Sequence, residues 1–373
     1  MKILFIKDTR GSDGIEGTGI YLLNLCKYLN AINTRYLVLY NSNDRYSELL
    51  TENNISYNYL NFPTFSLFNN FKIFKLFNIR NYIYKIIKKE KITHIVLQDP
   101  YLQIFISKSI DIPILCYQHA AFNINENKRS RNFYHYLHLI IKKYYNKCKN
   151  INKVVCVSNA SYLTSTIQYK IPKKKCIINN YGIEEIEPTK KNVNKTEINI
   201  LSVASIYHDK GVEDFCKVAK YIKLNYQNYN FNFIFVGGYR SKRYSNLIMD
   251  KYKNYVKFEG IQKNLFNYYN SADIFLFLSH RESAGQVIME AMRHKLLIIA
   301  SDIFGINEII INNKNGFLVD YKNHKKISET LITQVQNKKK FKNITNNAYN
   351  DYLKNYTIKK SSMALLEIIK NTY

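Results

Sequence analysis

The sequence lacks several features that would assign it to a common class of protein. Nowhere in its 373 residues do about 18 apolar residues follow one another, the length that a membrane-spanning helix requires. The apolar part of MKILFIKDTRG, at the N-terminus, is too short for a signal peptide. Both absences predict a soluble, cytoplasmic protein.

Cysteines are few and scattered. The six occur at Cys26, Cys116, Cys148, Cys156, Cys176 and Cys216. They include no C-x-x-C pair. We expect free, buried thiols in a reducing cytosol rather than disulfides or metal ligands.

Acidic residues are also scarce, with 28 Asp and Glu against 55 Lys and Arg, and the net charge is +27. This excess favours an anionic partner, such as anionic lipid, nucleic acid or a phosphorylated ligand. A skewed genome composition, rich in Asn, Lys, Ile and Tyr, would raise the lysine content without any function. Local clustering of charge is therefore more informative than the total.

Strand-like and helix-like segments alternate along the chain, which predicts α/β architecture with doubly wound, mostly parallel sheets. Strands are expected at 2–6, 94–99, 113–119, 153–158, 198–205, 231–238, 256–260, 273–278, 296–301 and 316–320. Helices are expected at 20–29, 210–223, about 284–293 and in the tail from about 323.

A polar stretch, EPTKKNVNKTE (187–197), has no apolar periodicity and predicts a linker between two domains. We expect residues 1–187 to form one Rossmann-like domain and residues 188–356 a second, with a C-terminal helix at about 357–373 packing back on the first. Ligands of open α/β sheets bind outside the carboxyl ends of the strands, so a cleft between two facing domains is the expected site.

One stretch, SHRESAGQVIMEAM (279–292), places two acids around a helix start in this lysine-rich chain. The first N–H groups of a helix lack partners and favour anions, and small side chains let a phosphate or sugar approach the backbone. Glu282 and Glu290 would be poor phosphate ligands but good acceptors for sugar hydroxyls. The alternative is a capped surface helix with two solvated glutamates.

This stretch, followed by LLIIASDIFGINEII and NKNGFLVD, resembles the signature region of glycosyltransferase family 4, retaining enzymes of GT-B fold. The family pattern is roughly P-S-x-x-E-x-x-G-x-x-x-x-E-A-M, then G-x-x-E, then N-G. Here the matching residues are Glu282, Gly285, Glu290, Ala291, Met292, Gly305, Glu308, Asn315 and Gly316. The rest of the chain resembles the family more weakly. The resemblance implies two Rossmann-like domains that face each other across a cleft.

The resemblance also implies roles for individual residues. Glu282 would contact the donor sugar and diphosphate together with the backbone of Ser283, Ala284, Gly285 and Gln286. Glu290 would bind the ribose. Lys210, in HDKG, would hold the diphosphate, where a cation offsets the charge that develops as the nucleotide leaves. The alternative for this lysine is one solvated residue among many.

In the N-terminal half, His119 ends the strand PILCYQH and would lie close to the donor sugar. Gly17 and Gly19, in the loop after the first strand, would lie near the diphosphate and the acceptor. A structural histidine and a plain turn are the alternatives. Tyr181 and Glu184, in YGIE, replace the Asn and Asp of the family's N-G-[IV]-D.

The chain departs from the family at several positions. Ser205 stands where many members have an arginine that shares the diphosphate, so Arg240 and Arg281 are candidates for a second phosphate cation. Ala284 occupies a place where an aromatic is common. The glycine and proline after the signature helix are replaced by Lys295 and Leu297, which should affect a turn more than the chemistry.

The resemblance implies a front-face, retaining transfer in which the leaving phosphate takes the acceptor's proton and the protein positions charge. The sequence contains no D-x-D-like metal box, so we predict no metal dependence. We also expect no cofactor, and we favour a UDP-sugar donor over a GDP-sugar.

Two basic stretches, 68–91 and 128–149, interleave aromatic and aliphatic residues with cations. This pattern suits an anionic membrane surface or nucleic acid; a solvated helix face is the alternative. We expect a peripheral enzyme on the inner face of the membrane that uses a glycan or lipid-linked acceptor. Since no nucleic-acid-binding motif appears, a nucleic-acid-binding protein is the weaker reading. A silent or repurposed GT-B relative, such as a nucleotide-sugar epimerase, remains an alternative because of Ser205.

Overall fold

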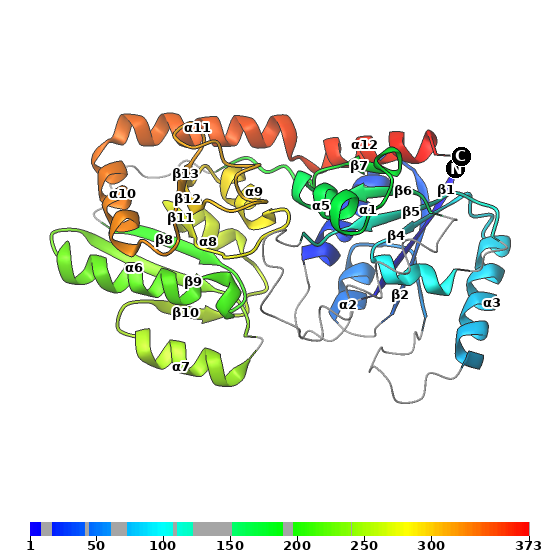
Figure 1. The fold of residues 1–373 in the computed structure, drawn as a ribbon, viewed down its shortest axis with the longest axis horizontal. Helices are drawn as coiled ribbons and strands as arrows, with labels where there is room; N and C mark the ends of the chain where they lie inside the picture. The colour runs from blue at the N-terminus through cyan, green and yellow to red at the C-terminus, as the bar shows by residue number, and fades with distance from the viewer. Residues whose placement is uncertain are drawn as a thin grey trace. The chain divides into compact units, whose positions relative to one another are not determined.

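The computed structural model describes residues 1–8, 17–41, 45–60, 73–106, 110–121, 151–188, 197–239 and 241–372. The chain divides into two compact units (Figure 1). The first comprises Met1–Glu184 and Ile358–Tyr373, and the second Glu185–Thr357. The boundaries therefore fall at 184/185 and 357/358, against the predicted 187/188 and 356/357.

The first unit contains a seven-stranded sheet in the order β3-β2-β1-β4-β5-β6-β7, and each neighbouring pair is parallel. Its strands are β1 (Lys2–Asp8), β2 (Arg35–Asn41), β3 (Tyr57–Tyr59), β4 (His94–Leu97), β5 (Ile114–Gln118), β6 (Ile151–Cys156) and β7 (Cys176–Ile178). The central strands are buried along almost their whole length because parallel sheets are covered on both faces.

The helices of the first unit include one from the far end of the chain. They are α1 (Gly17–Ala31), α2 (Arg45–Glu52), α3 (Ile73–Lys89), α5 (Asn159–Leu163) and α12 (Ile358–Lys370). A buried hydrogen bond of 2.9 Å joins the hydroxyls of Tyr21 in α1 and Ser361 in α12. The C-terminal helix thus packs on the first unit, close to the N-terminus (Figure 1).

The second unit contains a six-stranded parallel sheet in the order β10-β9-β8-β11-β12-β13. Its strands are β8 (Glu197–Val203), β9 (Asn230–Val236), β10 (Lys257–Gly260), β11 (Ile274–Phe277), β12 (Leu297–Ser301) and β13 (Phe317–Val319). Its helices are the 3-10 turn η4 (His208–Lys210), α6 (Val212–Asn225), α7 (Lys242–Tyr252), α8 (Phe266–Ser271), α9 (Gln286–Arg293), α10 (His324–Gln336) and α11 (Lys338–Asn355).

The strand order of the second sheet reverses at β8, which pairs with β9 on one side and with β11 on the other. The connections that leave β8 and β11 therefore start side by side at their carboxyl ends. In open α/β sheets this switch point is where ligands bind.

The structure differs from the sequence prediction in several elements. Strands β2, β3 and β7 were missed, and the last two have only three residues each, too few for a periodic pattern. Gly17 and Gly19, predicted in a loop, lie in the first turn of α1. The helix after β11 begins at Gln286 instead of about 284 because Gly285 has a φ of 55°.

Several predicted features lie partly or wholly outside the described residues. They include the whole basic stretch 128–149, the start of the basic stretch 68–91 and most of the predicted linker at 187–197. Among the helices that are described, none combines the length and the apolar character that crossing a membrane would need.

Candidate active site

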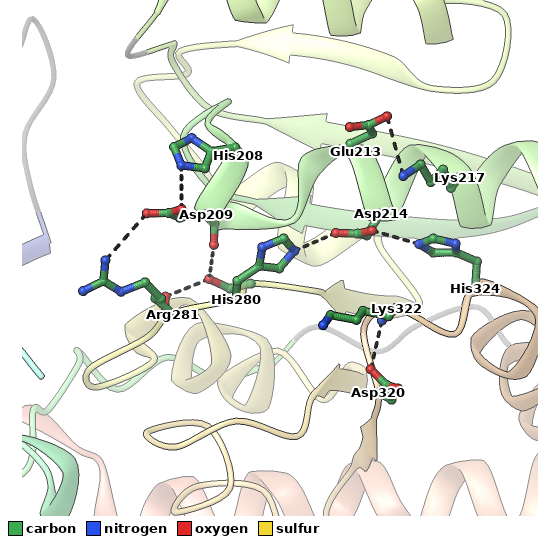
Figure 2. Close-up of polar contacts among 11 residues, drawn as sticks. His208, Asp209, Glu213, Asp214, Lys217, His280, Arg281, Asp320, Lys322 and His324 are labelled. Carbon is green, nitrogen blue, oxygen red and sulfur yellow. Dashed lines mark hydrogen bonds and ion pairs between the residues drawn. The ribbon is translucent and has the colours of Figure 1, made fainter. Parts of the chain in front are cut away.

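Two segments meet at the switch point of the second sheet, one around η4 after β8 and one after β11. The fully buried Ser279 hydroxyl donates to the Asp209 carbonyl at 3.2 Å and to the Arg281 carbonyl at 2.8 Å. The backbone N–H of His280 donates to the same Asp209 carbonyl at 2.9 Å. These contacts hold the two segments together; Figure 2 labels Asp209, His280 and Arg281, which take part in them.

The backbone geometry at Gly211 explains why the HDKG motif ends in glycine. Its φ is 65°, and a Cβ on it would lie 1.8 Å from the carbonyl oxygen of Leu278. Only glycine permits both the left-handed backbone and this approach. The lysine before it is thereby brought against the segment that follows β11.

Lys210 and Glu282 form an ion pair, with 3.0 Å between Nζ and Oε2 and side-chain exposures of 27% and 18%. The second carboxylate oxygen of Glu282 accepts a hydrogen bond from the Ser283 N–H at 3.0 Å. Burial raises the pKa of Glu282, but Lys210 and the N–H groups of Ser283 and Gly285 outweigh it and lower the pKa. Glu282 is therefore ionised at neutral pH, and it occupies backbone donors that the sequence assigned to a ligand.

A close backbone contact fixes Glu282 from the other side. Gly305, in the loop after β12, has a φ of 94°, and a Cβ there would lie 2.4 Å from the Glu282 carbonyl oxygen. The glycine of the G-x-x-E motif is thus needed for packing. Gly305 lets the loop after β12 approach the backbone of Glu282 this closely.

The Asn of the N-G motif has a structural role. Asn315 is 1% exposed, and its amide donates to Asp351 Oδ2 at 2.9 Å and to the Ile309 carbonyl at 3.1 Å. Its Oδ1 accepts from the Ile311 N–H at 2.7 Å. Asn315 therefore fastens the loop after β12 to α11.

The turn after α9 keeps its shape without glycine. Lys295, which replaces the family's glycine, has a φ of 53° and so adopts the left-handed conformation that ends many helices. Its Nζ lies 4.6 Å from the centre of the Tyr349 ring. A lysine therefore occupies a left-handed position at which glycine is more usual.

Glu290 lies on α9, five residues after Gly285, near Tyr269 and Arg293. Burial raises the pKa of Glu290, and the Tyr269 hydroxyl and Arg293 offset only part of the rise. Its Oε2 is buried and has no hydrogen-bond partner among the described residues. Buried acceptors are usually satisfied, so this oxygen is a candidate ligand contact. Ala284, in contrast, points into the core and is 4% exposed.

His119 follows β5 in the first unit and is held by two tyrosines. The Tyr117 ring stacks on it at 5.1 Å, and the hydroxyl of Tyr181 forms a short hydrogen bond with Nδ1. Burial lowers the pKa of His119 to about 3, so the ring is neutral at physiological pH. Nε2 is buried and has no hydrogen-bond partner in the described part of the chain. Tyr181, noted only as a departure from the family, thus positions the imidazole.

The sequence analysis missed Lys7. This lysine is the next-to-last residue of the buried strand β1 and is 2% exposed; its Nζ donates to Thr18 Oγ1 at 2.8 Å and to Asp99 Oδ2 at 3.3 Å. Because Thr18 lies between Gly17 and Gly19, the lysine anchors the start of α1. A charged residue inside an otherwise buried strand was the signal available in the sequence.

Of the two candidates for a second phosphate cation, the structure describes only Arg281. The Arg281 guanidinium lies 3.9 Å from Asp209 Oδ2 and is 42% exposed (Figure 2). Arg240 is outside the described residues.

Within the described ranges, no group of three or more His, Cys, Asp or Glu side chains could hold a metal ion.

Comparison with known families assigns the chain to a class. The family described as "Glycosyl transferases group 1" matches residues 183–351, and "Glycosyltransferase Family 4" matches residues 15–184. Together the two matches cover residues 15–351 of 373. The chain therefore belongs to the group 1 glycosyltransferases of family 4.

Solved structures establish the fold as GT-B. A glycosyltransferase from Rickettsia africae is 22% identical, with a TM-score of 0.78 over 99% of this chain and 97% of that one. Anabaena Alr3699/HepE, solved in complex with UDP and glucose, is 17% identical, with a TM-score of 0.79 over the whole of both chains.

Curated relatives match over shorter lengths. The capsular polysaccharide biosynthesis glycosyltransferase CapM of Staphylococcus aureus is 25% identical over 35% of this chain and 34% of its own. The N,N'-diacetylbacillosaminyl-diphospho-undecaprenol alpha-1,3-N-acetylgalactosaminyltransferase of Campylobacter jejuni is 26% identical over 48% and 50%. The chain thus spans about a third to a half of the length of these two relatives.

Proposed function

We propose that this protein is a retaining glycosyltransferase that moves a hexose-type sugar from a nucleotide-diphosphate sugar to a glycan or lipid-linked acceptor. The pathway would be the synthesis of a cell-surface polysaccharide or glycolipid. The observation that carries the proposal is the Lys210–Glu282 pair, 3.0 Å apart at the switch point of the second sheet. It places a cation and a hydroxyl acceptor where an α/β sheet binds its ligand.

The ion pair would have to open when a donor binds. An incoming diphosphate would compete with the Glu282 carboxylate for Lys210 Nζ, because both are anionic oxygen ligands of the same ammonium group. Once released, Glu282 accepts hydrogen bonds from hydroxyls of the donor sugar. Arg281 would supply the second cation in place of the arginine that Ser205 replaces, since its exposed guanidinium is one residue from Glu282.

Glu290 would bind the ribose of the nucleotide. Its buried Oε2 is an acceptor without a hydrogen-bond partner among the described residues. A ribose hydroxyl would donate to it and satisfy it.

The proposed transfer is a front-face reaction without a metal ion. His119 is neutral, with a pKa of about 3, so it contributes hydrogen bonding to the donor sugar rather than a proton at neutral pH. The phosphate oxygen that leaves would take the acceptor's proton, and Lys210 would offset the charge that develops on it. UDP is the favoured nucleotide; UDP and glucose are the ligands of the Anabaena structure with this fold.

Peripheral binding to the inner face of the membrane is part of the proposal. The C-terminal part of α3 exposes Tyr82, Tyr84, Lys85, Lys88 and Lys89. Cations beside aromatic rings suit the headgroup region of an anionic bilayer. The Campylobacter relative is named for a substrate linked to diphospho-undecaprenol, which favours a lipid-linked acceptor here.

Thermal unfolding with millimolar UDP or GDP tests the donor site. A nucleotide at about 100 times its dissociation constant adds roughly 2.7 kcal/mol to the folded state, which raises the Tm by a few degrees. Stabilisation by UDP alone supports the proposal as stated, and stabilisation by GDP alone would change the donor class. No shift with either would favour a silent relative of the family.

A further inference from the structure

Asp214 connects two histidines from different elements of the second unit. It lies in the first turn of α6, and its Oδ2 accepts a hydrogen bond from His280 Nε2 at 2.7 Å. Its Oδ1 accepts from Nε2 of His324, the first residue of α10, at 2.8 Å. Figure 2 shows the carboxylate between the two imidazoles. One side chain therefore joins α6, the loop after β11 and the start of α10.

These hydrogen bonds involve an ionised carboxylate. Burial raises the pKa of Asp214, but the hydrogen bonds and charges of His280 and His324 outweigh it and lower the pKa. An ionised carboxylate only accepts, so both imidazoles donate, and charge-assisted hydrogen bonds are the stronger kind. The Tyr321 ring stacks on His280 at 4.2 Å, which also restrains the imidazole on its face.

Three pairs of side chains join the segments that carry Lys210 and Glu282. The first is the ion pair between these two residues, and the second is Arg281 with Asp209 Oδ2, 3.9 Å apart. The third is the hydrogen bond between Asp214, four residues after the lysine, and His280, two residues before the glutamate. The first two pairs contain groups that we assign to the donor, and the third does not.

We propose, within the glycosyltransferase function proposed above, that Asp214 is a positioning residue for the donor site and acts through His280. When a diphosphate takes Lys210 from Glu282, the ion pair between the two segments is lost. The Asp214–His280 hydrogen bond then keeps the lysine and the glutamate at the spacing that the donor requires. The hydrogen bond between Asp214 and His324 joins α6 to α10 and does not connect the segments that carry Lys210 and Glu282.

Two histidine positions on one carboxylate provide a matched experiment. In His280→Gln the amide nitrogen reaches the place of Nε2 and can still donate to Asp214; in His280→Asn it falls short. His324→Asn removes the other hydrogen bond. The affinity for UDP, and separately for GDP, is measured by calorimetry on the full chain, together with the Tm of each unliganded variant.

We expect His280→Asn to weaken binding of the nucleotide that the wild type binds by about tenfold, as loss of a charge-assisted hydrogen bond would. His280→Gln should recover most of that affinity. His324→Asn should change it by less than about twofold, because His324 joins Asp214 to α10 and not to the segment that carries Glu282.

Three results would overturn the positioning role. They are equal losses of affinity in His280→Asn and His324→Asn, a loss that follows the fall in Tm across the variants, and a His280→Gln variant no better than His280→Asn. If the wild type binds neither nucleotide, the donor site itself is wrong. If instead the wild type binds a nucleotide and His280→Asn binds it equally well, the donor site stands and only the positioning role is refuted.

Discussion

Lys210 Nζ lies 3.0 Å from Glu282 Oε2, although 72 residues separate the two in the chain. The contact joins the connections that leave β8 and β11, and Gly211 permits the approach of the backbones. The pair follows from the strand order, which sets the two carboxyl ends side by side. It also implies that the lysine must exchange its partner when an anionic ligand binds.

This exchange predicts opposite effects on binding for the two members of the pair. Lys210→Met should weaken UDP binding by about 10- to 100-fold, because a hydrogen bond to a charged group contributes about 1.5–3 kcal/mol. Glu282→Gln should leave binding unchanged or tighten it, since the lysine is no longer held by a carboxylate, while sugar transfer falls. Calorimetry with UDP and a transfer assay measure the two properties. Equal weakening by both substitutions would mean that the pair is structural.

Much of this site could be predicted from the sequence because its residues lie in linear motifs. Glu282, Gly285 and Glu290 fall within one 14-residue stretch whose spacing follows a strand, a turn and a helix. Lys210 could be placed because it follows one strand and precedes a helix.

The contacts between distant segments could not be predicted. Asp214 and His324 are 110 residues apart, and nothing in either local sequence indicates the other. Lys7 and Asp99 likewise meet only because β1 and β4 pair in the sheet. The start of α1 was misplaced because the glycines that suggested a loop are tolerated in a first turn anchored by Lys7.

Two glycines with nearly the same φ allow the effect of a steric collision on stability to be separated from that of backbone strain. Gly211 and Gly260 have φ values of 65° and 64°, but a Cβ would collide with the Leu278 carbonyl only at Gly211; at Gly260 nothing lies within 4 Å. Gly260→Ala should cost about 1 kcal/mol of unfolding free energy from strain alone. Gly211→Ala should cost at least about 2 kcal/mol more, because the backbone must shift. Urea unfolding measures both, and equal losses would contradict the close approach.

Glu290 and Glu282 should give opposite pH dependences of stability. The pKa of Glu290 is higher in the folded protein than its unfolded-state pKa of about 4.5. The folded state therefore loses stability as the pH rises from about 4.5 through the folded-state pKa. The pKa of Glu282 is lowered, so its contribution is present above about 4.5 and is lost as pH falls through the folded value.

Glu290→Gln should therefore raise the Tm at pH 7–8 by a few degrees relative to wild type, because it removes a buried charge. The gain should shrink toward pH 4.5, where the wild-type carboxyl becomes protonated. Thermal unfolding across this pH range measures it, with Glu282→Gln as the control of opposite sign. In the same variant, the preference for UDP over its 2′-deoxy and 3′-deoxy analogues should decrease. An unchanged preference would remove Glu290 from the ribose site.

Binding to anionic membranes should depend on the exposed face of α3. Replacing Lys85, Lys88 and Lys89 by Ser should reduce association with vesicles that contain anionic lipid by about 10²-fold, since each cation near the surface contributes about 1 kcal/mol. The matched control replaces three exposed lysines of the second unit by Ser and so removes the same charge; they are Lys325, Lys326 and Lys354. Vesicle sedimentation measures both. If the two triple variants lose affinity equally, the overall charge drives association, and α3 is not the membrane-binding face.

The aromatic ring of Tyr84, 5.6 Å from Lys88 Nζ, should also contribute to membrane association. Tyr84→Ser should weaken association in the same assay even in high salt, where the lysines are screened.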